Sequence, residues 1–194
     1  AGLYAKDGGQ ILNEGSIRLG KNSVGLYGEG AGSNIVNDSL GEINIQDNSV
    51  GILLNNGNSI VNSGKIYGTS EKVTGIYSDS SNNTQIQIND DIILTGNKST
   101  GVYLTGTGSQ TFTNNAVITS GSSDSDKNPA IGVYNNGSTN KIINNSTIKT
   151  GDNSVGIYNN GGEVIQNSGS ITAGENSVGI YTDSGKVSLL TGSM

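Results

Sequence analysis

The sequence contains no cysteine, no histidine and no tryptophan, and it has a single proline in 194 residues. Without cysteine the chain forms no disulfides and offers no thiolate ligands to a metal. Without histidine it lacks the commonest general base and the commonest metal ligand, which excludes His-based catalytic triads. No G-x-S-x-G phrase marks a nucleophile elbow. We therefore expect a protein that is not an enzyme and has no catalytic residues, no metal and no cofactor.

Basic residues and long apolar runs are also scarce. The chain has ten Lys and Arg against sixteen Asp and Glu, which gives a formal net charge of −6. Nucleic-acid phosphates bind surfaces rich in Lys and Arg, so nucleic acid is excluded as a partner. No run approaches the about 18 apolar residues of a membrane-spanning helix. The sequence begins without an initiator Met or a signal peptide, so we expect it to be a fragment of a longer protein.

Glycine is abundant instead, and it recurs within a repeated phrase. "GKNSVGLY" begins at Gly20, "GDNSVGIY" at Gly151 and "GENSVGIY" at Gly174. The phrase glycine returns at intervals of 23 to 31 residues, which is typical of a solenoid whose single repeat cannot bury its apolar face alone. The phrase glycines are Gly2, Gly25, Gly51, Gly75, Gly101, Gly132, Gly156 and Gly179.

Each repeat holds three short apolar segments separated by turn residues. In the first, the residues on either side of the phrase glycine, such as Val24 and Leu26, are aliphatic or β-branched almost throughout. Because side chains alternate along a strand, these two positions predict an inward face, with the glycine pointing outward. The apolar residues predicted to be buried in the second segment are Ile11, Ile35, Ile60, Phe112, Ile142 and Ile165. Those of the third segment are Ile17, Ile43, Ile66, Ile93, Ile118, Ile148 and Ile171.

Three strands per repeat, each pairing with its equivalent in the next repeat, predict an all-β, right-handed parallel β-helix. Residues 1–194 then form a single segment of about eight coils, roughly 35–40 Å long at the usual strand spacing. In the fourth repeat Gln87 stands where an apolar residue is expected, which predicts a one-residue slip or a bulge. Residues 120–130 are expected to form an inserted surface loop.

An asparagine follows each second segment at the bend between strands. Asparagine tolerates left-handed backbone angles and bonds to the local chain, so it suits this position. Stacked from coil to coil, its amide can donate to one neighbour and accept from the other, which predicts a structural ladder. The predicted ladder residues are Asn13, Asn37, Asn62, Asn89, Asn114, Asn144 and Asn167.

Seven of the eight tyrosines stand two residues after a phrase glycine, so they predict one outward column. Stacked rings can cover the backbone, and an exposed aromatic row can also bind a sugar or a partner surface. Both roles remain open, although Leu53 interrupts the row. The candidate ligand-binding residues are Tyr77, Tyr103, Tyr134, Tyr158 and Tyr181.

Three weaker features complete the set of candidates. Asp90 and Asp91 are the best carboxylate pair, but their place at a bend indicates a solvated turn. In the inserted loop, Asp124, Asp126 and Asn128 alternate like the start of a Ca²⁺ loop, without the glycine and the closing Glu that such a loop needs. An outer apolar stripe is expected from Leu12, Val36, Val61, Ile88 and Ile143.

The whole chain resembles the passenger β-helix of Gram-negative (type V) autotransporter adhesins. The likeness rests on phrases such as "GENSVGIY", and it is closest to the long, Asn- and Gly-rich surface adhesins of fusobacteria. The "NSVGIY" phrase is also similar to "NSVAIG" of trimeric adhesin heads, but those left-handed folds repeat at about half the present period. The alternatives are a β-helical polysaccharide-active enzyme or a phage-type fibre.

The resemblance implies an extracellular passenger displayed at the cell surface or outer membrane. It implies a role in cell adhesion and virulence, with a host-cell or bacterial surface protein or glycan as the partner. Contact with the membrane would be made only through a C-terminal translocator that these residues do not contain. Passengers share no common binding motif, so the resemblance assigns no binding residue.

Overall fold

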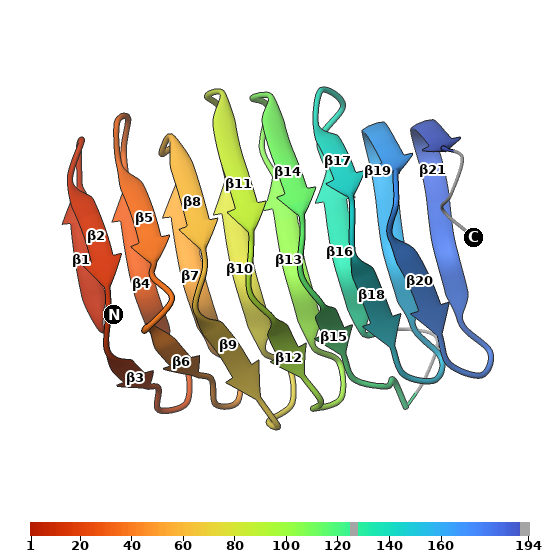
Figure 1. The fold of residues 1–194 in the computed structure, drawn as a ribbon, viewed down its shortest axis with the longest axis horizontal. Helices are drawn as coiled ribbons and strands as arrows, with labels where there is room; N and C mark the ends of the chain where they lie inside the picture. Colours follow the sequence, from red (N-terminus) through yellow and green to blue (C-terminus); the bar gives the residue numbers. More distant parts are fainter. Residues whose placement is uncertain (125–127, 191–194) are drawn as a thin grey trace.

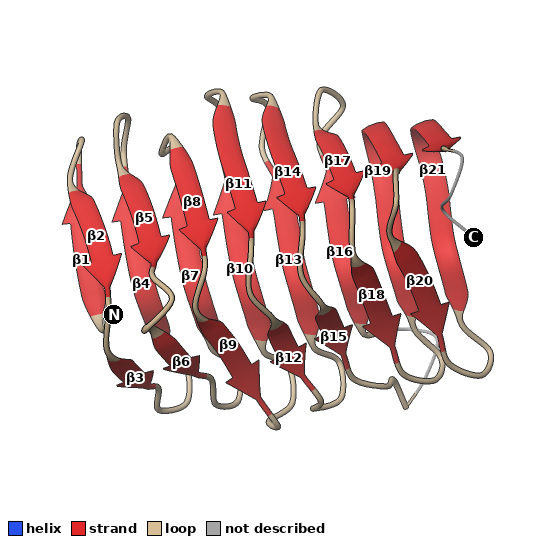
Figure 2. Ribbon diagram, viewed as in Figure 1, coloured by secondary structure: helices blue, strands red, loops and turns tan. Residues whose placement is uncertain are grey.

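The computed structural model describes residues 1–124 and 128–190, and within these ranges every regular element is a β-strand (Figure 2). Parallel strands stack into a β-solenoid of about seven turns, with the first and the last strand at opposite ends of the row (Figure 1). The all-β parallel β-helix fold predicted from the repeats is confirmed. Its right-handed winding stays a prediction.

The strands form three ladders, and the chain visits them in turn before it returns one coil further on. The first ladder contains β1 (Leu3–Lys6), β4 (Val24–Glu29), β7 (Val50–Asn55), β10 (Thr74–Asp79), β13 (Thr100–Thr105), β16 (Ile131–Asn136), β19 (Val155–Gln166) and β21 (Val178–Leu189). The second contains β2 (Gln10–Asn13), β5 (Asn34–Asn37), β8 (Ser59–Asn62), β11 (Thr84–Ile88), β14 (Gln110–Asn114) and β17 (Lys141–Asn144), and it continues along the later residues of β19 and β21. The third contains β3 (Ser16–Arg18), β6 (Glu42–Asn44), β9 (Lys65–Gly68), β12 (Ile92–Leu94), β15 (Ile118–Ser120), β18 (Thr147–Thr150) and β20 (Ser170–Ala173).

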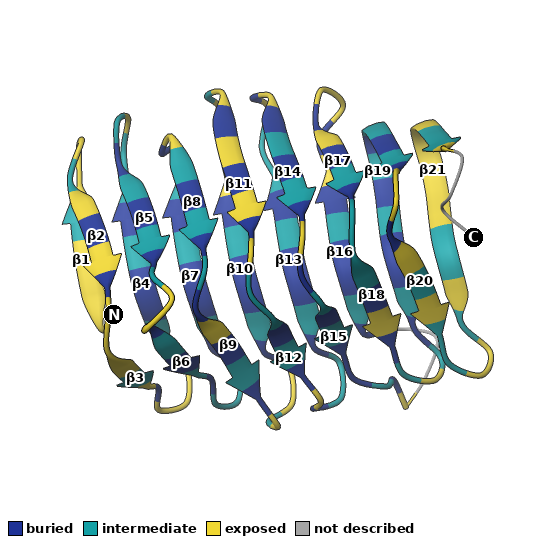
Figure 3. Cartoon of the chain, in the orientation of Figure 1, coloured by how far each residue is buried: buried dark blue, intermediate teal, exposed yellow. Residues whose placement is uncertain are grey.

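The core is a narrow apolar interior filled by one stack of aliphatic side chains from each ladder. In the second coil, for example, Leu26, Ile35 and Ile43 are all fully buried. Burying each such side chain contributes roughly 1.5–3 kcal/mol, so the repeated stacks hold the coils together. The strands of the end coils are more exposed than those between them, because each has a neighbour on one side only (Figure 3).

The register of the first strand differs from the prediction at the phrase glycine. Gly51 and Ile52 are both buried, and Val50 is only half-buried. A Cβ added to Gly51 would lie 2.7 Å from the carbonyl oxygen of Gly75 and 3.2 Å from Ile66 Cγ2. The prediction that the glycine points outward is therefore wrong: its Cβ position lies against the next coil and the third ladder, and glycine lets them approach closely.

The second and third ladders follow the predicted register except in the fourth and seventh coils. Ile86, rather than Gln87, pairs with Ile60 and is buried, so the predicted slip is confirmed. The slip carries forward, so that Ile92 replaces the predicted Ile93 in the third-ladder core. In the seventh coil Val164 pairs with Ile142 and takes the core place predicted for Ile165.

Candidate functional site

The tyrosine column lies on the outer side of the first ladder. Tyr77 pairs with Tyr103, Tyr103 with Tyr134, and the same register continues to Tyr158 and Tyr181. Ring centroids in this run are 4.5–5.1 Å apart with interplanar angles of 11–26°, so the rings are stacked. The run therefore forms a continuous aromatic ladder on the surface.

The N-terminal part of the column is shorter and less regular. Tyr4 and Tyr27 lie 5.1 Å apart and are tilted by 47°. Leu53 separates this pair from Tyr77, as the spacing predicts. The eighth tyrosine, Tyr67, lies on β9 in the third ladder and has no part in the column.

Stacking determines what the column can do chemically. The internal rings have both faces in contact with neighbouring rings, so they offer edges and hydroxyl groups to solvent. Stacking of a sugar ring requires a free aromatic face, which an internal ring of this ladder does not present. Covering of the sheet by the rings is therefore the role that the geometry favours for Tyr103, Tyr134 and Tyr158.

The surroundings of several tyrosines in the column raise the pKa values of their phenol groups. Burial against the neighbouring rings raises the pKa of Tyr77, Tyr103 and Tyr134, because it disfavours the phenolate. At the first coil, Tyr4 donates a hydrogen bond to Glu29 Oε2 at 2.7 Å. This bond to a carboxylate raises the pKa of Tyr4 to about 12. These four phenols are therefore uncharged at neutral pH.

A buried asparagine ladder lies at the bend after the second strand. Asn13 Nδ2 donates to Asn37 Oδ1, and Asn37 Nδ2 donates to Asn62 Oδ1, each at 2.8 Å. Further along, Asn114 Nδ2 donates to Asn144 Oδ1 at 2.8 Å, and Asn144 Nδ2 donates to Gln166 Oε1 at 3.0 Å. Five of the seven predicted residues thus lie in this ladder.

Asn89 and Asn167 do not lie in this buried ladder, so the prediction of a single ladder is wrong at these two residues. The slip in the fourth coil puts Ile88 in the ladder position, between Asn62 and Asn114. In the seventh coil Gln166 takes that position. Since Ile88 is fully buried, it also does not belong to the predicted outer stripe.

Asn89 and Asn167 instead belong to a second ladder on the exposed side of the same bend. Asn115 Nδ2 donates to Asn89 Oδ1 at 3.2 Å. Asn145 Nδ2 donates to Asn115 Oδ1, and Asn167 Nδ2 donates to Asn145 Oδ1, both at 2.9 Å. The Asn-Asn doublets at residues 114–115 and 144–145 are the sequence signal for this pair of ladders, because each doublet supplies one residue to each ladder.

A further buried amide cluster lies inside the sixth and seventh coils. Asn135 Nδ2 donates to Asn159 Oδ1 at 2.8 Å, and Asn140 Nδ2 donates to Asn135 Oδ1 at 2.7 Å. In the third and fifth coils the matching first-ladder place holds Leu54 and Leu104. The change from Leu to Asn after the tyrosine is the signal that could have revealed this cluster.

The described carboxylates of two weaker candidates, the carboxylate pair and the aspartates of the inserted loop, accept hydrogen bonds from the protein itself. Asp90 Oδ1 accepts from the Asp91 backbone N–H at 2.7 Å, and Asp91 Oδ1 accepts from the Val117 N–H at 2.9 Å. In the inserted loop Asp124 accepts from Asn97 Nδ2 at 2.9 Å, while Asp126 lies outside the described residues. Within residues 1–124 and 128–190 no three acidic side chains gather as a metal site would require.

Comparison with known proteins gives no match: no family model, no curated protein and no solved structure matches the chain. In the part of the chain that the structure describes, no helix is long and apolar enough to cross a membrane. Functional inference therefore rests on the sequence resemblance and on the geometry of the solenoid.

Proposed function

We propose that the chain is a rigid structural and adhesive segment of a bacterial cell-surface autotransporter adhesin. In this role it is displayed outside a Gram-negative cell and supports attachment to other bacteria or to host cells, through a surface protein or a glycan. The repeated "NSVGIY" phrases, which resemble those of passenger β-helices, support the adhesive part of the proposal.

One observation carries the structural part: each coil is bonded to the next along all three ladders. The backbone pairing extends from β1 to β21 in the first ladder and from β3 to β20 in the third. In such a stack every coil contacts only its neighbours, so stiffness and stability extend along the row. A rod of this kind suits a spacer that holds a binding surface away from the cell.

The adhesive part is tested with beads coated with the purified chain. We expect these beads to attach to epithelial cells or to bacteria well above beads coated with albumin. Attachment at the albumin level to both would contradict adhesion by this segment. The stack of coils is tested separately by hydrogen exchange, where backbone amides of the inner coils that exchange as fast as those of the end coils would contradict it.

The tyrosine column is tested in the same assay with Tyr134 and Tyr158 both replaced by serine. Because the two rings stack on each other and on their neighbours, we expect a modest loss of stability, about 0.5–1.5 kcal/mol per lost ring pair. We expect bead attachment to be unchanged. Loss of attachment at unchanged stability would instead identify the column as the ligand site.

A further inference from the structure

The turns that precede six of the first-ladder strands, β4, β7, β10, β13, β19 and β21, each contain one residue with a left-handed backbone at the same place. It lies three positions before the phrase glycine, and in four coils it is an asparagine with φ between 52° and 56°. Asparagine adopts this conformation more readily than other non-glycine residues, because its short side chain bonds locally. These asparagines are Asn22, Asn48, Asn153 and Asn176.

Three consecutive coils depart from asparagine at this position. Lys72 and Lys98 have φ values of 55° and 58°, although lysine has no side-chain oxygen to support the left-handed backbone. The pairing of Thr100 with Ile131 places Pro129 in the same column. Proline fixes φ near −65°, so this turn cannot repeat the left-handed conformation. The fold thus keeps unfavourable residues at this place in adjacent coils, and such strain is common at binding sites.

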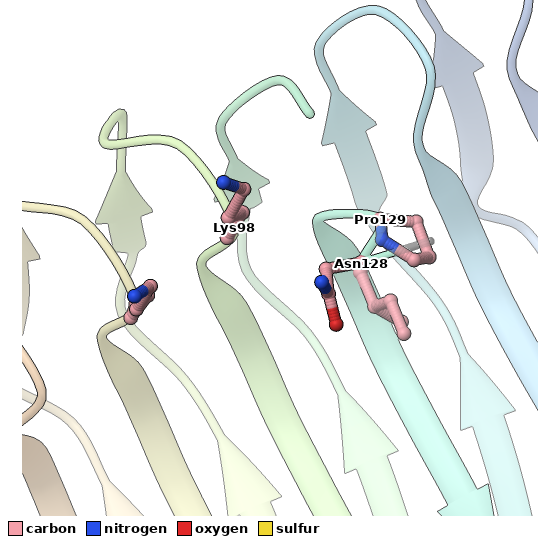
Figure 4. A pocket seen from close by; sticks show the side chains of 5 residues that line it. Lys98, Asn128 and Pro129 are labelled. Carbon is pink, nitrogen blue, oxygen red and sulfur yellow. The ribbon is translucent and has the colours of Figure 1, made fainter. Parts of the chain in front are cut away.

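These three residues line one cavity. It has a volume of about 500 Å³, and Asn128 and Ile131 complete its lining. Figure 4 shows that Lys98 lies on one coil and that Asn128 and Pro129 lie on the next. The volume lies within the range of small-ligand sites, roughly 300–1,000 Å³. The cavity therefore lies at the three coils in which this turn position is not asparagine.

The two charged side chains that line the groove, Lys72 and Lys98, are both positive, in a chain whose formal net charge is −6. Lys98 Nζ lies 3.4 Å from Asp124 Oδ2, whose other oxygen accepts from Asn97. Lys72 has no ion-pair partner among the described residues, although Asp47 and Glu71 border a neighbouring hollow with it. Lys72 and Lys98 carry like charges on adjacent coils, and of the two only Lys98 forms an ion pair among the described residues, so an anionic ligand group between them would relieve their repulsion.

We propose that this groove binds an acidic saccharide that carries one or two carboxylate groups. The carboxylate would lie between Lys72 and Lys98, and the amide of Asn128 could bond to sugar hydroxyls. Pro129 and Ile131 supply apolar surface for the C–H face of a sugar ring. The acidic residues of the neighbouring hollow disfavour a ligand with a long run of negative charge.

The backbone favours a saccharide over an acidic peptide. Peptides are often bound as an added strand on an exposed sheet edge. Here the strands that flank the groove, β10, β13 and β16, are each paired on both sides by neighbouring coils. No edge is open there, so recognition has to use side chains. The proposal does not depend on the adhesin role, because the rod keeps its ladders whether the groove is filled or empty.

The test measures binding of 3′-sialyllactose to the purified chain by NMR titration at low salt, with lactose as the uncharged control. We expect binding of sialyllactose that weakens as salt is added. Replacing Lys72 and Lys98 with asparagine should lower the affinity by about tenfold or more. Because asparagine is the residue of the other coils, this variant is expected to fold with an unchanged or higher melting temperature.

Two further single variants test whether the effect is specific to the lysines of the groove. Lys149→Asn removes an exposed lysine on β18, outside the groove, and should leave the affinity unchanged. Asp124→Asn removes the carboxylate that competes for Lys98, so it should raise the affinity severalfold. Equal binding of lactose and sialyllactose, or unchanged affinity in the double lysine variant, would overturn the proposal. Absence of sialyllactose binding at 10–20 mM would overturn it too, and binding of an oligoglutamate instead would assign the groove to acidic peptides.

Discussion

The two asparagine ladders use the same hydrogen bond in two environments. In the buried ladder Asn37 is fully inaccessible and donates to Asn62 at 2.8 Å. In the exposed ladder Asn145 donates to Asn115 at 2.9 Å, with solvent beside it. Water can replace a lost partner only in the second case, so we expect similar bonds to make very different contributions to stability.

The buried ladder is interrupted at the fourth coil, whereas the exposed ladder is not. Ile88 separates the two parts of the buried ladder, while the exposed ladder begins at Asn89, one residue later. An apolar residue is tolerated inside because it leaves no amide of its own unsatisfied, and Asn62 Nδ2 finds the Asp90 carbonyl oxygen at 3.2 Å. Inside the solenoid, a polar group without any partner therefore costs more stability than a gap in the ladder whose neighbours find other partners.

The largest expected effect comes from placing an asparagine in the core away from the ladder. Ile86→Asn removes a buried apolar side chain between Ile60 and Phe112 and leaves an amide without partners. We expect a loss of about 3–5 kcal/mol in the free energy of unfolding. Urea denaturation followed by circular dichroism measures it.

Ile88→Asn is the matched variant, because it makes the same exchange within the ladder. Its new amide lies between Asn62 and Asn114 and can join the two parts of the ladder. Two regained bonds of about 1 kcal/mol each offset most of the lost burial, so the net loss should be about 1 kcal/mol. Equal destabilisation by the two variants would show that the ladder position has no special tolerance for an amide.

The next largest effect is expected from Asn37→Ala. This change leaves Asn13 Nδ2 without its acceptor and Asn62 Oδ1 without the Asn37 donor. An unsatisfied buried polar group costs about 1–3 kcal/mol, so the loss should reach at least about 2 kcal/mol. A melting temperature equal to that of the unchanged chain would show that the buried ladder does not stabilise the fold.

The sequence predicts the repeat and the outward tyrosines well because they follow from spacing alone. Gly51 shows where that reasoning fails: strict alternation places it outside, whereas close approach of two coils and of Ile66 turns it inward. Spacing alone assigns Asn89 and Asn167 to the wrong ladder for a related reason, since a one-residue slip moves a side chain to the other face. The groove at Lys98 depends on the path of neighbouring turns, which spacing does not encode.

A smaller effect should appear at high pH, where the tyrosine column tests a surface ladder of another kind. Burial raises the pKa of Tyr77, Tyr103 and Tyr134 in the folded chain. The unfolded chain then loses its phenol protons first as the pH rises through about 10, so stability is complete below that pH and falls above it. Denaturation between pH 8 and 12 measures this, and the variant with these three tyrosines changed to phenylalanine should show a weaker fall.

The smallest effect is expected from Asn145→Ala in the exposed ladder. The change removes the bond that Asn145 donates to Asn115 and the bond that it accepts from Asn167. Because both neighbours are exposed, water can satisfy the released groups, and a surface change of this kind usually alters stability by less than about 0.5 kcal/mol. The measurement is the same urea titration used for Asn37→Ala, so the two losses compare directly. A loss as large as that of Asn37→Ala would mean that the contribution of an asparagine ladder to the free energy of unfolding comes from its periodic hydrogen bonds and does not depend on burial.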